Sequence, residues 1–143
     1  MLVGPQGYIW LHLNVGSVTS PRFSAGAALN ASDGSVIYSG DSWSPFTLVD
    51  MDGDGVLDLV LSDFYNRLAV YKNTAKGTSL ANFSSTPYYI VSSVTGQVFI
   101  APDRRFDVGD WNRDGFPDVV TGAYCADVKL FLTSNSIAGA SAQ

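Results

Sequence analysis

Two nine-residue windows share the pattern D-x-[DN]-x-D-G-x-x-D, and this pattern constrains the fold of the chain more than any other feature. The windows are residues 50–58 and residues 110–118. Side-chain oxygens at positions 1, 3 and 5 can converge on one point, because the glycine at position 6 permits a sharp turn. Such hard oxygen donors suit Ca²⁺ better than a transition metal. A pair of acidic surface turns is the alternative, and the recurrence of the whole pattern disfavours it.

The two windows therefore predict two calcium sites. The ligands would be side-chain oxygens at positions 1, 3, 5 and 9 and the backbone carbonyl at position 7. These residues are Asp50, Asp52, Asp54, Val56 and Asp58 in the first loop, and Asp110, Asn112, Asp114, Phe116 and Asp118 in the second. Because Asn112 replaces a carboxylate, charge alone predicts tighter binding at the first loop, although loop rigidity can reverse this order.

Neither window is an EF-hand loop. That motif requires a bidentate glutamate at position 12 between two helices, and here position 12 is Leu61 in one copy and Thr121 in the other. The flanking segments, residues 46–49 and 57–61 around the first loop, are short, apolar and rich in β-formers. Short runs of this kind indicate strands rather than helices. We expect each ion in a strand–loop–strand connection.

Composition supports an all-β fold and excludes several classes of function. All 13 acidic residues are aspartate, and 46% of the chain is apolar against 15% charged. Helix formers are scarce, whereas Val, Thr, Ser, Gly and aromatic residues are plentiful, as in sheets. A net charge of −5 argues against a nucleic-acid partner. No run approaches 18 apolar residues, so we expect no membrane insertion by this segment.

The chain repeats with a period of 60 residues, the distance between the starts of the two windows. Phe46 matches Phe106, and Tyr71 matches Phe131. The N-terminus fits the same period less regularly: residues 1–4 resemble 119–122, and residues 8–14 resemble 68–73. The chain would thus begin inside a repeat, just downstream of the place of a calcium loop, and hold about 2.4 repeats.

The two aspartate loops and the apolar strand after each resemble the FG-GAP / VCBS repeat family, whose repeats are the blades of integrin-α-type β-propellers. Leu13-Asn14 and Tyr71-Lys72-Asn73 are similar to the aromatic-x-Asn strand end of that family, whereas the third copy ends in Leu132-Thr133 without the asparagine. The resemblance implies four-stranded antiparallel blades that need neighbours on both sides. We expect an all-β fragment of a larger propeller, or separate chains that together complete a ring.

The repeat also predicts how the chain is divided. Residues 1–40 would hold the C-terminal part of a first blade plus a connection. Residues 41–100 would be a second repeat containing calcium loop 50–58, and residues 101–133 a third repeat containing calcium loop 110–118. Residues 134–143 are small and polar, which predicts a linker or an unpaired strand.

The favoured function is that of a calcium-stabilised binding or adhesion module, extracellular or at the cell surface, that engages a protein or a glycan. Loops of this kind fill where calcium is millimolar, and Asn30 and Asn82 begin N-glycosylation sequons. Trp111, at position 2 of the second loop, is a candidate contact for a ligand. A structural subunit of a filament or surface assembly, with neighbouring blades as partners, is one alternative. The propeller part of a secreted polysaccharide-acting enzyme is another.

Catalysis by the chain itself is not expected. His12 is the single histidine, and no G-x-S-x-G nucleophile motif is present. The spacing of the aspartates suits a bound cation rather than acid–base chemistry. The sequence therefore predicts no catalytic residue and no organic cofactor.

Overall fold

The regular secondary structure of the described residues consists of short antiparallel strands. The computed structural model describes residues 2–3, 6–40, 44–75, 80–92, 95–97, 105–122 and 128–133, and these ranges contain ten strands and no helix. Accordingly, the described chain has no helix of the length and apolarity needed to cross a bilayer. The predicted linker at residues 134–143 lies outside the described residues. The prediction of an all-β fold is confirmed.

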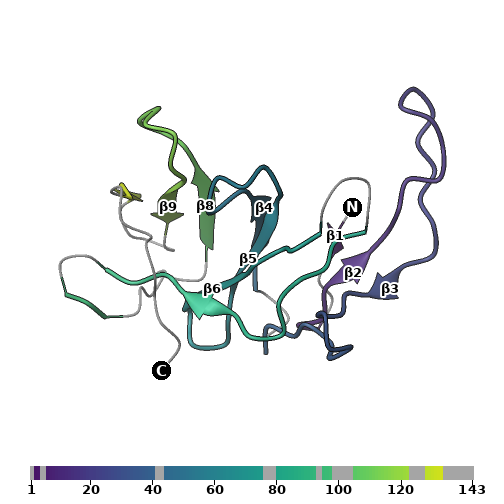
Figure 1. Ribbon diagram of the computed structural model, residues 1–143, viewed down its shortest axis with the longest axis horizontal. Helices are drawn as coiled ribbons and strands as arrows, with labels where there is room; N and C mark the ends of the chain where they lie inside the picture. Colours follow the sequence, from purple (N-terminus) through teal and green to yellow (C-terminus); the bar gives the residue numbers. More distant parts are fainter. Residues whose placement is uncertain are drawn as a thin grey trace.

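The ten strands form three sheets that succeed one another across the molecule (Figure 1). The first sheet contains β1 (Leu2–Val3), β2 (Trp10–Leu11) and β3 (Ala27–Ala28). The second contains β4 (Phe46–Val49), β5 (Asp58–Ser62), β6 (Leu68–Tyr71) and β7 (Tyr88–Tyr89) in chain order. The third contains β8 (Arg105–Gly109), β9 (Asp118–Gly122) and β10 (Lys129–Phe131). The second sheet thus has the four antiparallel strands that a propeller blade requires.

Strand register reproduces the 60-residue period. Phe46 pairs with Leu61 in the second sheet, and Phe106 pairs with Thr121 in the third. Likewise the pairing of Leu59 with Tyr71 recurs as Val119 with Phe131.

The first sheet follows the same scheme. Leu2 pairs with Leu11 in the way that Val60 pairs with Val70, which is the alignment predicted for the N-terminus. The internal repeat is therefore a structural repeat of three successive sheets.

The second sheet is apolar on both faces. Side chains alternate between the two faces along a strand, and three consecutive residues of β5 are apolar. Leu59 and Leu61 of β5 face the first sheet, whereas Val60 faces the third. On the first-sheet side the buried cluster also contains Ile9, Leu29, Ala31, Ile37, Ala69 and Phe83. On the other side Val60 clusters with Met51 and Val70, and Phe106 and Val108 pack against them. All five residues of β5 are consequently buried.

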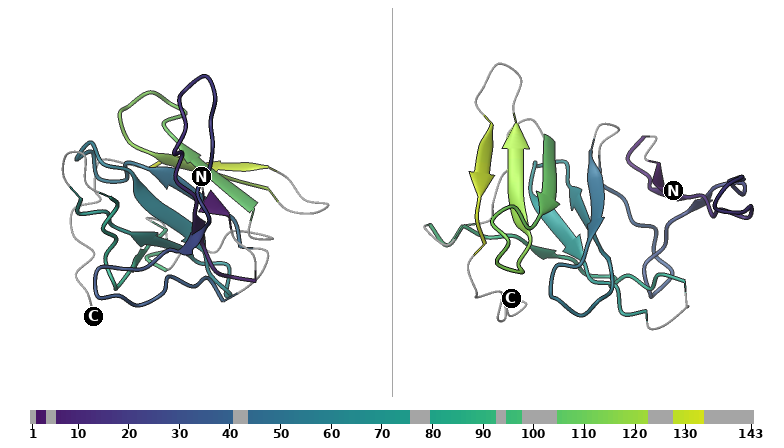
Figure 2. Two further views of the ribbon diagram at one scale, coloured as in Figure 1. Left: turned by 90° about the vertical axis from the view of Figure 1, so that its right-hand side faces the viewer. Right: turned by 90° about the horizontal axis from the view of Figure 1, so that it is seen from above.

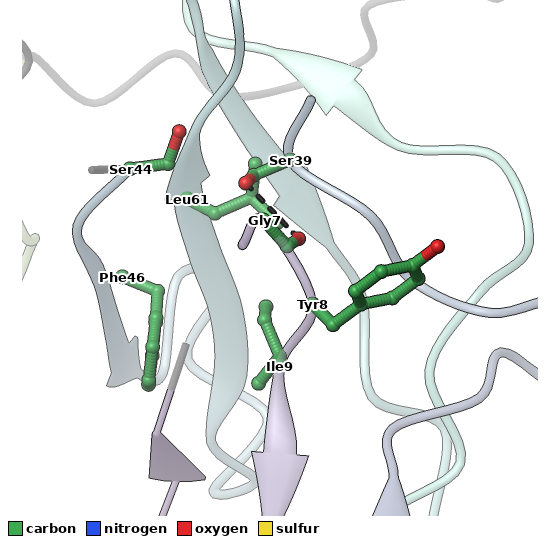
Figure 3. Close-up of a pocket in the computed structure, with 7 residues that line it drawn as sticks. All are labelled: Gly7, Tyr8, Ile9, Ser39, Ser44, Phe46 and Leu61. Atoms are coloured by element: carbon green, nitrogen blue, oxygen red, sulfur yellow. Dashed lines mark hydrogen bonds between the residues drawn. The ribbon is translucent and has the colours of Figure 1, made fainter. Parts of the chain in front are cut away.

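The junction of the first and second sheets is closely packed. Figure 3 shows Ile9, Phe46 and Leu61 meeting there, and the hollow among them has no room for a water molecule. The Ser39 hydroxyl donates a hydrogen bond of 3.1 Å to the Gly7 carbonyl at its edge. The Tyr8 ring points away from this junction (Figure 3).

A wider gap remains along the same interface. An apolar groove of about 320 Å³ is lined by Leu11, Leu29, Phe46, Thr47, Leu48, Ala81 and Phe83. At the next interface Tyr88, which pairs with Val70, packs between the second and third sheets. The residue in the equivalent place of the first sheet, paired with Leu11, is Ala27. An alanine fills far less volume than a tyrosine, so the side chain at this place in the first sheet contributes less packing than Tyr88 does in the second.

The loops that follow β2 and β6 are closed at their base by asparagine side chains. The Oδ1 atom of Asn73 accepts hydrogen bonds from the amides of Ala75 (3.1 Å) and Asn82 (2.9 Å). One repeat earlier, Asn14 Oδ1 accepts from the amides of Gly16 and Arg22, each at 3.0 Å. The first of these loops extends well beyond the body of the sheets (Figures 1 and 2). In both repeats, the asparagine at the strand end therefore holds the two ends of the following loop together.

The outer face of the third sheet is exposed where the matching face of the second sheet is buried. Trp111 and Leu130 are 54% and 51% exposed. Their counterparts one repeat earlier, Met51 and Val70, are 1% and 0% exposed because the third sheet covers them. The third sheet therefore presents an uncovered face, which we call the outer face and define by Trp111, Val120 and Leu130.

This difference gives matched substitutions at one position of two repeats. Val70→Ala removes two buried methyl groups and should lower the free energy of unfolding by about 2 kcal/mol. Leu130→Ala should cost less than about 1 kcal/mol, because the side chain is half exposed. Urea denaturation followed by circular dichroism measures both. Equal losses would show that the outer face is covered in solution.

Candidate metal centres

The two aspartate loops join equivalent strands, β4 to β5 and β8 to β9, and lie at the same edge of their sheets (Figure 1). The position-6 glycines, Gly55 and Gly115, have φ angles of +84° and +89°. Position 4 is also left-handed, with φ of +76° at Gly53 and +62° at Arg113. Glycine adopts this region without steric cost. The predicted role of the position-6 glycine in the turn is therefore confirmed in both loops.

The position-1 carboxylate organises each turn through backbone amides. Asp50 Oδ1 accepts hydrogen bonds from the amides of Gly53 (2.8 Å) and Asp54 (3.1 Å), and its Oδ2 accepts from Gly55 (2.8 Å). In the second loop Asp110 accepts from Asp114 and Gly115, each at 3.0 Å. A carboxylate offers about four lone-pair sites. The three hydrogen bonds from backbone amides leave the Asp50 carboxylate with one lone-pair site for a cation.

The position-9 carboxylate is buried, and it connects its loop to the end of β6 in the second sheet and of β10 in the third. Asp58 is 1% exposed, and it accepts hydrogen bonds from the amides of Met51 (3.1 Å) and Asn73 (2.7 Å). Asp118 is 0% exposed, and it accepts from Trp111 (3.0 Å) and Thr133 (2.9 Å). This carboxylate therefore has a structural role whether or not an ion is bound.

Burial affects ionisation around the first loop. Removal from water raises the pKa of Asp58, and the amides of Asn73 and Met51 oppose that shift. Burial raises the pKa of Tyr88 to about 12, with smaller contributions from the negative charges of Asp58 and Asp52. The negative field of the loop thus extends to a neighbouring ring.

Thr133 takes over one part of the role of Asn73. The Asn73 side-chain Nδ2 donates a hydrogen bond to the Leu57 carbonyl at 3.1 Å. The Thr133 hydroxyl donates to the equivalent Pro117 carbonyl at 2.9 Å. The departure from the asparagine pattern noted in the sequence therefore preserves the contact beneath the second loop.

The first loop brings together three of its predicted ligands. One carboxylate oxygen from each of Asp50, Asp52 and Asp58 lies within 4.8 Å of the others. Calcium–oxygen bonds are about 2.3–2.6 Å long, so one ion can contact oxygens up to about 5 Å apart. The donor set therefore fits Ca²⁺. Asp54 lies outside this group, with its Oδ1 accepting from the Val56 amide at 2.9 Å, so Asp54 and the Val56 carbonyl stay predicted ligands.

The second loop is closed by an amide instead. Asn112 Nδ2 donates to Asp114 Oδ2 at 2.9 Å, and Asn112 Oδ1 accepts from the Asp114 amide at 3.0 Å. Within the described ranges, no such group of three acidic side chains forms at Asp110, Asp114 and Asp118. The calcium ligands of this loop, including the Phe116 carbonyl, stay a prediction.

One residue at the first loop was missed by sequence reasoning. The Lys72 ammonium pairs with Asp52 and lies 3.4 Å from Asp54 Oδ2. Its hydrogen bond to Asp52 is the main cause that raises the pKa of Lys72. The available signal was the single basic residue between the strand and Asn73, where the third repeat has Leu132.

His12 is placed in a structural setting. Its ring packs so closely on Gly26 that an added Cβ there would lie 2.6 Å from the ring. Its Nδ1 is within 3.2 Å of the Ser24 carbonyl. The histidine, which directly follows β2, is therefore packed against the chain at Gly26 and Ser24.

Comparison with known proteins places the chain in a family. The model of the FG-GAP-like repeat matches residues 50–121, from the first residue of the first loop to the strand after the second. This match covers just over half of the chain, and the chain belongs to this family. Searches of curated proteins and of solved structures gave no significant match. The repeat and the sheet arrangement together define a propeller-type module.

The buried carboxylate predicts unequal effects of two neutralising substitutions. Asp58→Asn leaves one acceptor oxygen for two buried amides, so in EDTA it should lower the free energy of unfolding by about 2 kcal/mol. Asp54→Asn, at an exposed position whose single amide bond asparagine can keep, should change it by less than about 0.5 kcal/mol. Chemical denaturation in EDTA compares them. Losses of similar size would contradict the role assigned to Asp58.

Proposed function

We propose that the chain is a calcium-stabilised extracellular or cell-surface module of propeller type, which engages a protein or a glycan and does not itself catalyse a reaction. The observation that carries this proposal is the convergence of Asp50, Asp52 and Asp58 at the first loop. The membership of the chain in the FG-GAP-like repeat family supports the module class.

Calcium would act on stability because the loops concentrate negative charge. Seven of the 13 acidic residues lie in the two nine-residue windows. Close carboxylates repel one another, and a cation removes this repulsion while adding binding energy to the folded state. Extracellular calcium is sufficient to fill loops of modest affinity, which supports an extracellular location.

A binding role is supported by the position of the loops. Both loops lie on one side of neighbouring sheets (Figure 1), and most of their residues are exposed. Trp111, at position 2 of the second loop, is exposed, and an aromatic ring there can contact a protein or a sugar. Asn30 and Asn82 are both exposed, as glycan attachment in a secreted protein requires. The carboxylates of Asp50 and Asp110 hold backbone amides, which favours a structural role over acid–base chemistry.

A structural subunit of a larger assembly is the second candidate. The outer face of Trp111, Val120 and Leu130 supports it, because the same face of the second sheet is covered by β8. Large uncovered apolar patches usually mark interaction surfaces. The partner would be a further blade, in the same or another chain.

Removal of calcium tests the main proposal. The melting temperature should be several degrees higher in 2 mM CaCl₂ than in EDTA, since binding to the folded state alone adds stability of about 2–3 kcal/mol at roughly 100 times the dissociation constant. Asp50→Ala should reduce this increase, because it removes a ligand of the first loop. Differential scanning calorimetry provides the measurement. An equal melting temperature in both buffers would overturn the calcium role.

Association tests the second candidate. The purified chain should be oligomeric or aggregated in light scattering, since each 100 Å² of apolar surface covered by association contributes about 2.5 kcal/mol at about 25 cal/mol per Å². Leu130→Lys should reduce association by placing a charge on the outer face. Leu80→Lys, at a 68% exposed leucine elsewhere, is the matched control. A well-folded wild-type monomer would rule out assembly through the outer face.

A further inference from the structure

Lys72 is held by the fold beside the first loop. It directly follows β6, where its amide donates to Ser84 Oγ at 3.1 Å and its carbonyl accepts from the Ser84 amide at 2.7 Å. From this fixed backbone the ammonium contacts the Asp52 carboxylate and lies 3.4 Å from that of Asp54. A cation supplied by the chain itself thus bridges positions 3 and 5 of the loop.

The third repeat differs at both members of this pair. Asn112 stands at the place of Asp52, and Leu132 at the place of Lys72. There the Asn112 amide donates to Asp114 at 2.9 Å, so positions 3 and 5 are bridged within the loop. The acidic residue and the lysine occur together in one repeat and are both missing from the other. In these two repeats, lysine accompanies the charged residue at position 3.

The carboxylate that Lys72 holds is also one that an ion would need. Asp52 belongs to the group with Asp50 and Asp58 whose oxygens lie within 4.8 Å of one another. We propose that the Lys72 ammonium is a tethered competitor for the divalent cation at the first loop, so that calcium binds there by displacing it. Among the described residues, no lysine or arginine pairs with a carboxylate of the second loop, where Leu132 takes the place of Lys72. This inference rests on the proposed calcium function.

Displacement is sterically open to Lys72. Its side chain is 42% exposed, and those of Asp52 and Asp54 are 30% and 37% exposed. The ammonium can therefore move into solvent without crossing a packed region. Because pairs of this exposure are weak, the competition should lower calcium affinity by about two- to fivefold. This competition acts against the advantage that a fourth carboxylate gives the first loop.

The test is a calcium titration that reads each loop separately. Backbone amide signals of Gly53 and Gly55 in ¹⁵N-labelled protein report on the first loop, and that of Gly115 reports on the second. Lys72→Leu introduces the residue found in the third repeat, and Lys72→Gln is a second variant that keeps a polar side chain. Lys129→Leu, on exposed β10 at the end away from the loop, is the control of equal charge change.

Both Lys72 variants should bind calcium at the first loop about two- to fivefold more tightly, with the second loop unchanged. In EDTA they should melt at a lower temperature, because the internal cation is lost. Unchanged first-loop affinity, or an equal gain from Lys129→Leu, would overturn the inference and leave the calcium function in place. Calcium binding that appears only in the Lys72 variants would support it. Failure of every variant to bind calcium would remove both.

Discussion

The structure depends on a sheet that has no polar face. Leu59 and Leu61 of β5 point one way and Val60 the other, and all are almost fully buried. Water cannot contact either side without loss of the burial energy that holds the strands, about 25 cal/mol for each Å² of apolar surface. Such a sheet is stable only between two neighbours. The first and third sheets meet this condition for the second, and the outer face of the third sheet is where it is left unmet.

The loops obey a different constraint, which is that closely spaced carboxylates must be neutralised or hydrogen-bonded. Asp50 and Asp110 accept hydrogen bonds from backbone amides of their own turn. Asp58 and Asp118 accept from amides of their loop and from the amide of a residue that follows β6 or β10. What remains at positions 3 and 5 is met by lysine in one repeat and by asparagine in the other. The two turns thus share one backbone geometry, whereas the group that contacts the carboxylates at positions 3 and 5 differs between the repeats.

Much of the fold could be predicted because it depends on patterns that are local in the sequence. The glycine at position 6 and the β-formers around each loop define the turns and strands, and the period of 60 residues defines the repeat. The pairing of Leu2 with Leu11 followed from aligning the N-terminus to that period. These features depend on neighbours along the chain or on exact repetition.

The candidate site was less predictable because its contacts join distant residues. The pair of Lys72 and Asp52 spans 20 residues and two strands, and no local pattern requires it. Asp58 was predicted only as a ligand, whereas the structure also makes it a buried acceptor for Met51 and Asn73. Trp111 was considered as a ligand contact, and the burial of its counterpart Met51 gives it a second interpretation as a residue of a sheet interface.

The asparagines at the base of the β2 and β6 loops separate the architecture of each sheet from the length of the loop it carries. Asn14 and Asn73 join the two ends of the connection by hydrogen bonds to backbone amides. Extending a loop beyond a fixed base costs little entropy, because the cost grows only with the logarithm of length. We therefore expect these loops to accept changes of length and inserted peptides while the sheets remain intact.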